Sequence, residues 1–61
     1  MKLHEIPRGS KIHADGEVIT FHNTDGMYSY CTTSEGNVVH LAVWTPLKKV
    51  DDHYEIDHHD D

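Results

Sequence analysis

The chain has 61 residues, of which 36% are hydrophobic, and eleven acidic residues against five basic ones give a formal net charge of −6. A chain of this length buries only about 60% of the surface that its unfolded form exposes, so we expect one small domain without a deep enclosed active site. The negative charge disfavours direct binding to a nucleic-acid backbone. It suits either solubility or docking onto a basic protein surface.

Cysteine content and hydropathy indicate the compartment. Cys31 is the single cysteine and therefore has no intramolecular partner for a disulfide. The chain contains neither an apolar stretch of about 20 residues, as a membrane span needs, nor a signal-peptide pattern at Met1-Lys2-Leu3. We expect a cytoplasmic protein that does not interact with a membrane.

Three acidic-Gly pairs, ten residues apart, separate runs that are rich in β-branched and aromatic residues: Asp15-Gly16, Asp25-Gly26 and Glu35-Gly36. This spacing predicts consecutive β-hairpins. After a lead-in that ends at Pro7, the expected strands are Ser10–Ala14, Glu17–Asn23, Met27–Thr33 and Val38–Trp44, the last two joined through Ser34-Glu35-Gly36-Asn37. Thr45-Pro46-Leu47 breaks the ladder because Pro has no N–H to donate, and a short closing strand is expected between Lys48 and Ile56.

Two-residue loops at each acidic-Gly pair define a register. In this register Ile12 faces Ile19, Phe21 faces Tyr30, and Tyr30 faces Leu41. The inner face would then carry Ile12, Ile19, Phe21, Tyr28, Tyr30, Val39, Leu41 and Val43, covered by Leu3, Ile6, Leu47, Val50 and Ile56.

Together these patterns predict an all-β fold, a small SH3-like barrel of four to five short antiparallel strands over residues 1–56. The main rival is an open meander or a swapped dimer, because so short a sheet has edges to protect. Residues 57–61, two His among three Asp, have nothing apolar to bury and are expected to form a flexible tail.

The same register predicts an outer face with potential chemistry. Thr20, Cys31 and His40 fall in one cross-strand row, with His22, Ser29 and Ala42 in the next. An imidazole opposite a thiol lowers the thiol's pKa, so Cys31 and His40 form a candidate nucleophile pair. Catalysis also needs a substrate cleft and an oxyanion site, and no motif supplies either. We therefore expect no enzymatic activity, with Cys31 a small half-buried residue.

Seven His are many for this length, yet their spacing is poor for a metal site. The chain has no Cys-x-x-Cys and no His-Glu-x-x-His arrangement. We expect neither a metal site nor a cofactor, apart from adventitious chelation by Asp57-His58-His59-Asp60-Asp61. Full protonation of the His would move the formal charge from −6 to +1, so a partner held by acidic complementarity should dissociate on acidification.

Large side chains at one end of the sheet are candidates for a binding patch. Trp44 lies on the outer row by alternation, with Met27 opposite, and together they would form an exposed apolar surface. Trp is a frequent anchor of protein interfaces. The alternative is a Trp44 that plugs the end of a barrel, because it stands just before the Thr45-Pro46 break.

The run Val18-Ile19-Thr20-Phe21-His22-Asn23-Thr24-Asp25-Gly26-Met27-Tyr28-Ser29-Tyr30-Cys31, continued by Gly36-Asn37-Val38-Val39-His40-Leu41 and closed by Thr45-Pro46-Leu47, resembles small tailed-bacteriophage proteins with an SH3-like core. That family comes with no assigned catalytic residues. The resemblance implies a product made inside an infected bacterium that acts by binding a host or phage protein.

Two functions remain as expectations. The first is a non-enzymatic protein that binds a host or phage protein through its acidic surface and an exposed aromatic or edge-strand patch. The second is a structural or self-assembling accessory role, as a homo-oligomer that pairs through its strand edges, attached to a virion. The residues predicted to contact a partner are Met27, Trp44, His22, His40 and Cys31.

Overall fold

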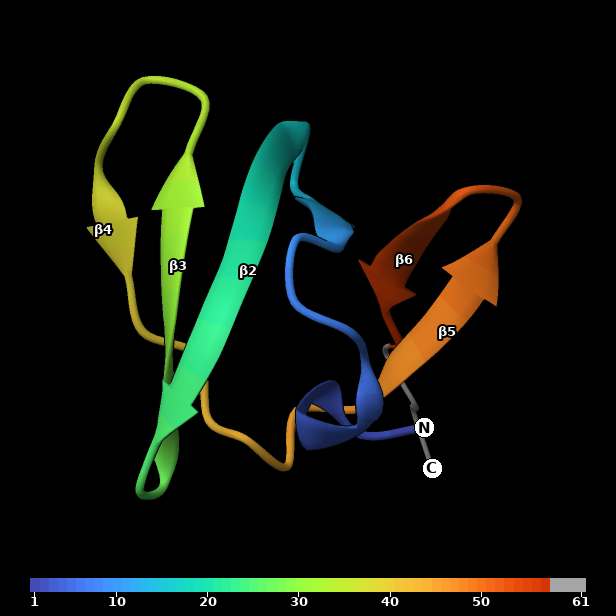
Figure 1. Cartoon of the computed structure of the whole chain (residues 1–61). Coiled ribbons are helices and arrows are strands. Elements are labelled where there is room, and N and C mark those ends of the chain that lie inside the picture. Colours follow the sequence, from blue (N-terminus) through green and yellow to red (C-terminus); the bar gives the residue numbers. More distant parts are fainter. Residues whose placement is uncertain (58–61) are drawn as a thin grey trace.

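A computed structural model of the chain describes residues 1–57, which form one mixed sheet of six strands (Figure 1). Across the sheet the strands lie in the order β4-β3-β2-β1-β6-β5. A short 3-10 turn, η1 (Leu3–Glu5), precedes the sheet, and the strands are β1 (Lys11–Ala14), β2 (Glu17–Asp25), β3 (Tyr28–Thr33), β4 (Val38–Val39), β5 (Leu47–Val50) and β6 (His53–Ile56).

The prediction of an all-β fold is confirmed, whereas the described sheet is not closed into a barrel. Strands β1 to β4 form an antiparallel meander, but β6 lies parallel to β1, with Ile12 opposite Tyr54. The segment expected to supply one closing strand forms a hairpin instead, because the chain reverses at Asp51, whose φ of 54° is in the left-handed region. The second strand of this hairpin takes the place beside β1, and β5 and β4 remain as separate edges.

The link between β4 and β5 passes behind the lower parts of β3 and β2 in Figure 1 and reaches β5 past the N-terminal turn. It hydrogen-bonds on both sides: Val43 N–H donates to Met27 O at 3.0 Å, and His4 N–H donates to Val43 O at 3.1 Å. This segment was predicted to continue a strand from Val38 to Trp44. The regular strand ends at Val39, although Tyr28 and Ala42 still form an isolated bridge.

The hydrophobic core lies on one face of the sheet, which we call the inner face, under the N-terminal turn and the β4–β5 link. The prediction that Ile12, Ile19 and Phe21 share a buried face is confirmed. The buried apolar residues are Leu3, Ile6, Ile12, Ile19, Phe21, Cys31 and Leu47, with Ala14, Val39, Leu41, Tyr54 and Ile56 packed against them partly buried. Val43 and Val50, predicted as core residues, are half-buried outside this cluster.

The first hairpin has the predicted turn and register. Asp15 and Gly16 form its two-residue loop, with φ of 51° and 81°, and Ile12 lies opposite Ile19. Positive φ at both loop positions matches the right-handed twist of the flanking strands, which is why an Asp-Gly pair marks such a turn.

The second hairpin differs from the prediction by its turn. Asp25 pairs with Tyr28, so the two-residue loop is Gly26-Met27 with glycine first, at φ 65°. This turn alone would move the partner of Phe21 from Tyr30 to Thr32. One extra residue in β2, between Phe21 and Asn23, reduces the net shift to one residue, so Phe21 lies opposite Cys31. Because side chains alternate between faces, a one-residue shift turns the whole of β3 over. Tyr28 and Tyr30, predicted to be buried, are 52% and 39% exposed, and Cys31 is buried in their place.

Two predictions concern the chain ends and membranes. Of the expected tail, 57–61, only Asp57 is described, and its N–H donates to Pro46 O at 2.9 Å; residues 58–61 lie outside the described residues. Within residues 1–57 no helix has the length and apolar character that crossing a membrane requires.

Candidate functional site: the outer groove of the meander

A β-bulge in β2 determines which polar side chains reach the outer face. Phe21 pairs with Cys31, but the next pair is Asn23 with Tyr30, so His22 is an extra residue in this strand. A bulge of this kind reverses the alternation of the residues that follow it. Consequently Phe21 points into the core, whereas Asn23 and Asp25, which strict alternation would place on the same face as Phe21, lie opposite the exposed Tyr30 and Tyr28.

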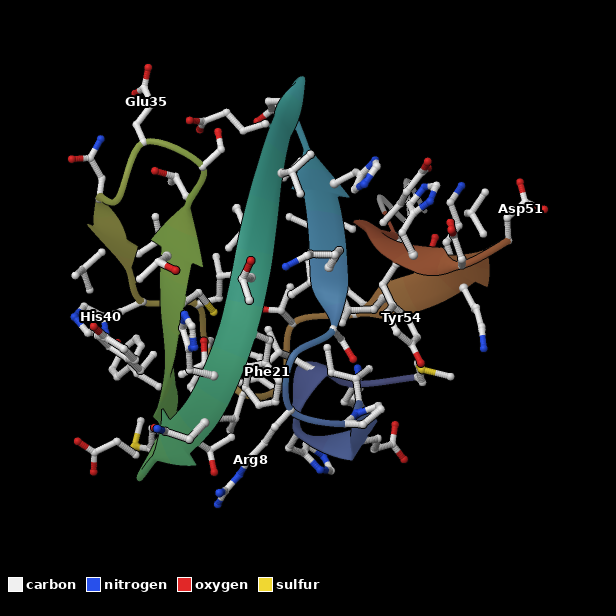
Figure 2. All side chains as sticks on the ribbon, turned by 45° about the horizontal axis from the view of Figure 1, so that its top comes forward. Arg8, Phe21, Glu35, His40, Asp51 and Tyr54 are labelled. Atoms are coloured by element: carbon white, nitrogen blue, oxygen red, sulfur yellow. The ribbon has the colours of Figure 1, made fainter. Side chains whose placement is uncertain are left out.

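These residues surround a groove with a volume of about 610 Å³, which we call the outer groove. Its lining comes from residues 23–25 of β2, residues 28–30 of β3, and His40. Sites for small molecules and side chains commonly occupy about 300–1,000 Å³, so the groove is large enough to hold part of a ligand. Figure 2 shows His40 at the margin of the sheet, beside β4.

Tyr30 is the central aromatic residue of the groove and is flanked by two imidazoles. Its ring centroid lies 5.3 Å from that of His22 and 6.3 Å from that of His40, with interplanar angles of 43° and 47°. His22 Nε2 is also 2.7 Å from Thr32 Oγ1. Tilted aromatic contacts at these distances are favourable. They hold the Tyr30 ring in place while leaving it accessible to solvent.

One hydrogen bond of the His40 ring shows which of its two nitrogens carries the proton. Its Nδ1 lies 3.0 Å from the Ser29 carbonyl oxygen, which can only accept a hydrogen bond, so Nδ1 carries the proton and donates it. In the neutral ring the lone pair is then on Nε2. The side chain is exposed, so this acceptor is available to a ligand.

Ser29 connects the groove strands to the β4–β5 link. Its hydroxyl donates to Leu41 O at 2.8 Å and accepts from Leu41 N–H at 3.1 Å, and Ser29 N–H donates to Leu41 O at 2.7 Å. Ser29 is 1% exposed, so water cannot replace these bonds. The small polar side chain therefore fixes His40, the neighbour of Leu41, against β3.

The hypothesis of a Cys31–His40 pair is wrong in its geometry. Cys31 is fully buried on the inner face, where its thiol lies 3.3 Å from Ser29 Oγ, and it pairs across the ladder with Val39. His40, one residue further on, is exposed on the other face. Burial raises the pKa of the Cys31 thiol, and the hydrogen bond to Ser29 opposes this only in part. The predicted outer row of Thr20, Cys31 and His40 does not form, since the shift of β3 moves Cys31 inside.

Met27 and Trp44 are both exposed, at 60% and 51%. They lie at the same end of the molecule, because Val43, the residue before Trp44, bonds through its N–H to Met27 O. The exposure of Trp44 excludes its alternative position as a buried plug. Both side chains are therefore accessible to a partner, as the prediction of a binding patch requires.

A second imidazole cluster lies on β1 and β6, away from the groove strands β3 and β4. The His13 and His53 rings stack with centroids 3.7 Å apart at an angle of 11°. His53 also lies 3.2 Å from Glu55 and 3.5 Å from Asp52, and these carboxylates, Glu55 first, raise its pKa. Within residues 1–57 no three His, Cys, Asp or Glu side chains converge as a metal would need. The predicted chelation by the tail involves His58 to Asp61, which lie outside the described residues.

Comparison of the chain with protein-family models, with curated proteins and with solved structures gave no match. The site is therefore defined by its geometry alone. That geometry brings His22 and His40 together around Tyr30, keeps Met27 and Trp44 accessible, and removes Cys31. The sequence prediction missed the groove residues Asn23, Asp25, Tyr28 and Tyr30. The two adjacent polar residues at 22 and 23 were the available sign of a bulge.

Proposed function

We propose that this chain is a non-enzymatic protein-binding module whose outer groove is its contact surface. The observation that carries the proposal is the exposure of Tyr28 and Tyr30 on the lining of a groove of about 610 Å³. Tyrosine buries a large area with few rotatable bonds and is enriched among the residues that dominate binding energy. Exposed Met27 and Trp44 extend the apolar surface available to a partner at one end of the molecule.

Charge supports a basic partner surface. The meander, residues 11–39, contains Asp15, Glu17, Asp25 and Glu35 against the single basic residue Lys11, so it contributes −3 of the formal net charge of −6. Like-charged partners are repelled by such a surface and basic ones are attracted to it. The His content adds a pH dependence, since seven protonations change the formal charge from −6 to +1 and should release a basic partner.

The test is affinity capture from a bacterial lysate with the tagged full chain, compared with a Tyr28→Leu/Tyr30→Leu double variant. The wild type should retain a partner that the double variant loses. Val38→Ala, which truncates another exposed apolar residue of the meander, is the matched control and should retain it. Capture that is unchanged in the double variant would contradict the proposal. Capture is then repeated in about 1 M salt, where the Debye length falls to about 3 Å, to separate charge attraction from apolar contact. The Trp44→Ala variant tests whether the apolar surface at Met27 and Trp44 contributes to partner binding.

The open sheet favours a second candidate function, self-assembly through strand edges. The described sheet ends at β4 on one side and at β5 on the other, and exposed edges pair readily with further strands. Lys48 and Lys49 on β5 are exposed and oppose such pairing. Size-exclusion chromatography with light scattering distinguishes the two functions, because a defined higher oligomer supports self-assembly and a monomer supports the binding module. The bacteriophage context and cytoplasmic location implied by the sequence stay predictions.

A further inference from the structure

The outer groove combines the groups that recognise a planar cation. Asp25 lies directly opposite Tyr28, and Asn23 lies opposite Tyr30. Side chains that face each other across an antiparallel pair have Cβ atoms about 4.5–5.5 Å apart. A carboxylate, an amide oxygen and two tyrosine rings therefore lie within reach of a single bound group, and the Nε2 acceptor of His40 is on the same lining.

The β5–β6 hairpin, at the opposite edge of the sheet from β4, contains a contact between a cation and a tyrosine ring. There Lys49 Nζ lies 5.9 Å from the centroid of the Tyr54 ring, which is a cation–π contact made within the molecule. The groove tyrosines belong to residues 12–47, a segment without any Lys or Arg. Their rings are exposed, and Asp25 is exposed with them.

We propose that the outer groove binds an arginine side chain presented by a basic segment of another protein. This inference rests on the proposed function, for which it names the partner's chemistry. The guanidinium would stack on a tyrosine ring and donate two N–H bonds to the Asp25 carboxylate. The Asn23 amide oxygen and His40 Nε2 are further acceptors at the margin of the groove.

Arginine fits the lining better than lysine does. A guanidinium is flat, so it can stack on a ring, and its fork of N–H groups matches a carboxylate in two parallel bonds. An ammonium is compact and strongly hydrated, and it bonds a carboxylate as a point charge. The Tyr30 ring, supported on both sides by His22 and His40, needs little ordering when a flat group settles on it.

The test is a titration of the ¹⁵N-labelled full chain, followed by NMR, with a capped nine-residue peptide of three Gly-Ser-Arg repeats. Two matched peptides replace arginine by citrulline, a neutral group of the same shape, or by lysine. We expect amide shifts confined to residues 23–30 and His40. The arginine peptide should bind roughly tenfold more tightly than the citrulline peptide, because charge-assisted bonds are about twice as strong as neutral ones. The lysine peptide should bind with intermediate affinity.

Variants then locate the carboxylate. Asp25→Asn and Glu35→Gln each remove one negative charge from the meander side, but Glu35 lies at the tip of the β3–β4 loop, pointing away from the sheet (Figure 2). Asp25→Asn should weaken the arginine peptide about tenfold and Glu35→Gln less than about twofold, since screening reduces the effect of a distant charge. Tyr30→Leu should weaken it to a similar degree as Asp25→Asn.

Several results would overturn the inference. These are equal affinity for arginine and citrulline, equal effects of Asp25→Asn and Glu35→Gln, shifts that map to β5 and β6, or no shifts at millimolar peptide. Dimerisation of the wild type that Arg8→Gln abolishes would also overturn it, because the groove would then hold a second copy of this chain. Failure of the proposed function is a separate result: a lysate partner retained by the Tyr28→Leu/Tyr30→Leu variant. A partner lost by that variant, together with no preference for arginine, would refute this inference alone.

Discussion

The two halves of the sheet, on either side of the β1–β2 boundary, contain similar side chains but differ in their internal partners. Tyr54 and His53 contact charged residues, whereas Tyr30 contacts the imidazoles of His22 and His40. On the hairpin side (β1, β6 and β5), Lys49 lies over the Tyr54 ring, and His53 stacks on His13 and contacts Glu55. On the groove side (β2, β3 and β4), tyrosine rings and a carboxylate face solvent in a segment without Lys or Arg. Figure 2 shows His40 and Asp51, one residue from each side, at opposite ends of the molecule.

This difference indicates where binding energy is available. Groups that already have partners gain little from a ligand, because any new contact replaces an existing one. Exposed rings and an exposed carboxylate can make new contacts when a basic group arrives. The distinction between the sides is one of surface chemistry, since a single core lies beneath both.

The largest expected effect tests whether the two sides fold as one unit. Phe21 of β2 is 3% exposed and belongs to the same cluster as Ile12 of β1 and Leu47 of β5. Phe21→Ala should cost about 3–5 kcal/mol through lost burial and a cavity. That is a large part of the stability of a domain of this size. Because the cluster includes residues from both sides, the two sides should unfold together.

Urea denaturation followed by NMR measures this effect. The amide signals of Tyr30 and Glu55, one from each side, should disappear at the same urea concentration in the wild type and at the same lower concentration in Phe21→Ala. Phe21→Leu, which preserves apolar contact, should cost less than about 1.5 kcal/mol. Loss of the Tyr30 signal while that of Glu55 persists would show that the sides unfold independently.

The second expected effect concerns the attachment of the β4–β5 link to the groove. Ser29→Ala removes the hydroxyl that bonds both the N–H and the carbonyl of Leu41. It leaves the partly buried N–H of Leu41 without its acceptor, which costs about 1–3 kcal/mol. Because His40 adjoins this contact, the His40 signals should also broaden, a change confined to the groove side. Ser34→Ala, in the exposed β3–β4 loop, should change the free energy of unfolding by less than about 0.5 kcal/mol.

The sequence predicted the first hairpin well and the rest of the sheet less well. An Asp-Gly loop determines the first hairpin, and alternation from it correctly placed Ile12, Ile19 and Phe21 in the core. At Asp25-Gly26, the same dipeptide, the two-residue loop begins one residue later, so that Asp25 still belongs to β2 and Gly26 is the first loop residue. Local sequence does not distinguish the two turns, because glycine accepts the positive φ that either requires.

The bulge at His22 then decided which side chains form the site. Strict alternation places Asn23 and Asp25 on the face of Phe21, and the adjacent polar residues His22 and Asn23 are a weak sign that they leave it. The register with two-residue loops at the acidic-Gly pairs placed Tyr28 and Tyr30 inside, whereas the structure fills that space with the smaller Ser29, Cys31 and Thr33. A tyrosine hydroxyl needs a partner when buried, so exposed tyrosines and small inner residues satisfy both packing and hydrogen bonding. The hairpin at Asp51 was missed because an Asp pair without glycine is a weak turn signal.

A smaller effect is expected from the turn that the sequence did not reveal. Asp51 adopts φ 54°, which Asp and Asn tolerate and a β-branched residue does not. Asp51→Val should therefore destabilise the protein by about 1–2 kcal/mol, whereas Asp51→Asn should have almost no effect. Hydrogen exchange should show faster exchange in β5 and β6 than in the wild type, with the protection of β2 and β3 reduced less. Equal loss of protection on both sides would mean that the hairpin does not open separately.

The smallest expected effect is the pH dependence of the hairpin side. The hydrogen bond that His53 donates to the Glu55 carboxylate, and then the one that it donates to Asp52, raise the pKa of His53 in the folded protein above its ordinary value of about 6.5. The folded state then binds this proton more tightly than the unfolded state does. Its contribution to stability is fully present below the unfolded pKa and is lost as the pH rises through the folded one.

The urea midpoint of the wild type should therefore exceed that of His53→Gln by more at pH 5.5 than at pH 8.5. Glu55→Gln, which keeps His53 but removes its main partner, should lose most of this difference, and the His53 ring should titrate at lower pH by NMR. His22→Gln on the groove side is the matched control, because His22 bonds a Thr32 hydroxyl instead of a carboxylate. A pH dependence that disappears in His22→Gln and persists in Glu55→Gln would place the titrating contact on the groove side, reversing the contrast between a paired and an available surface.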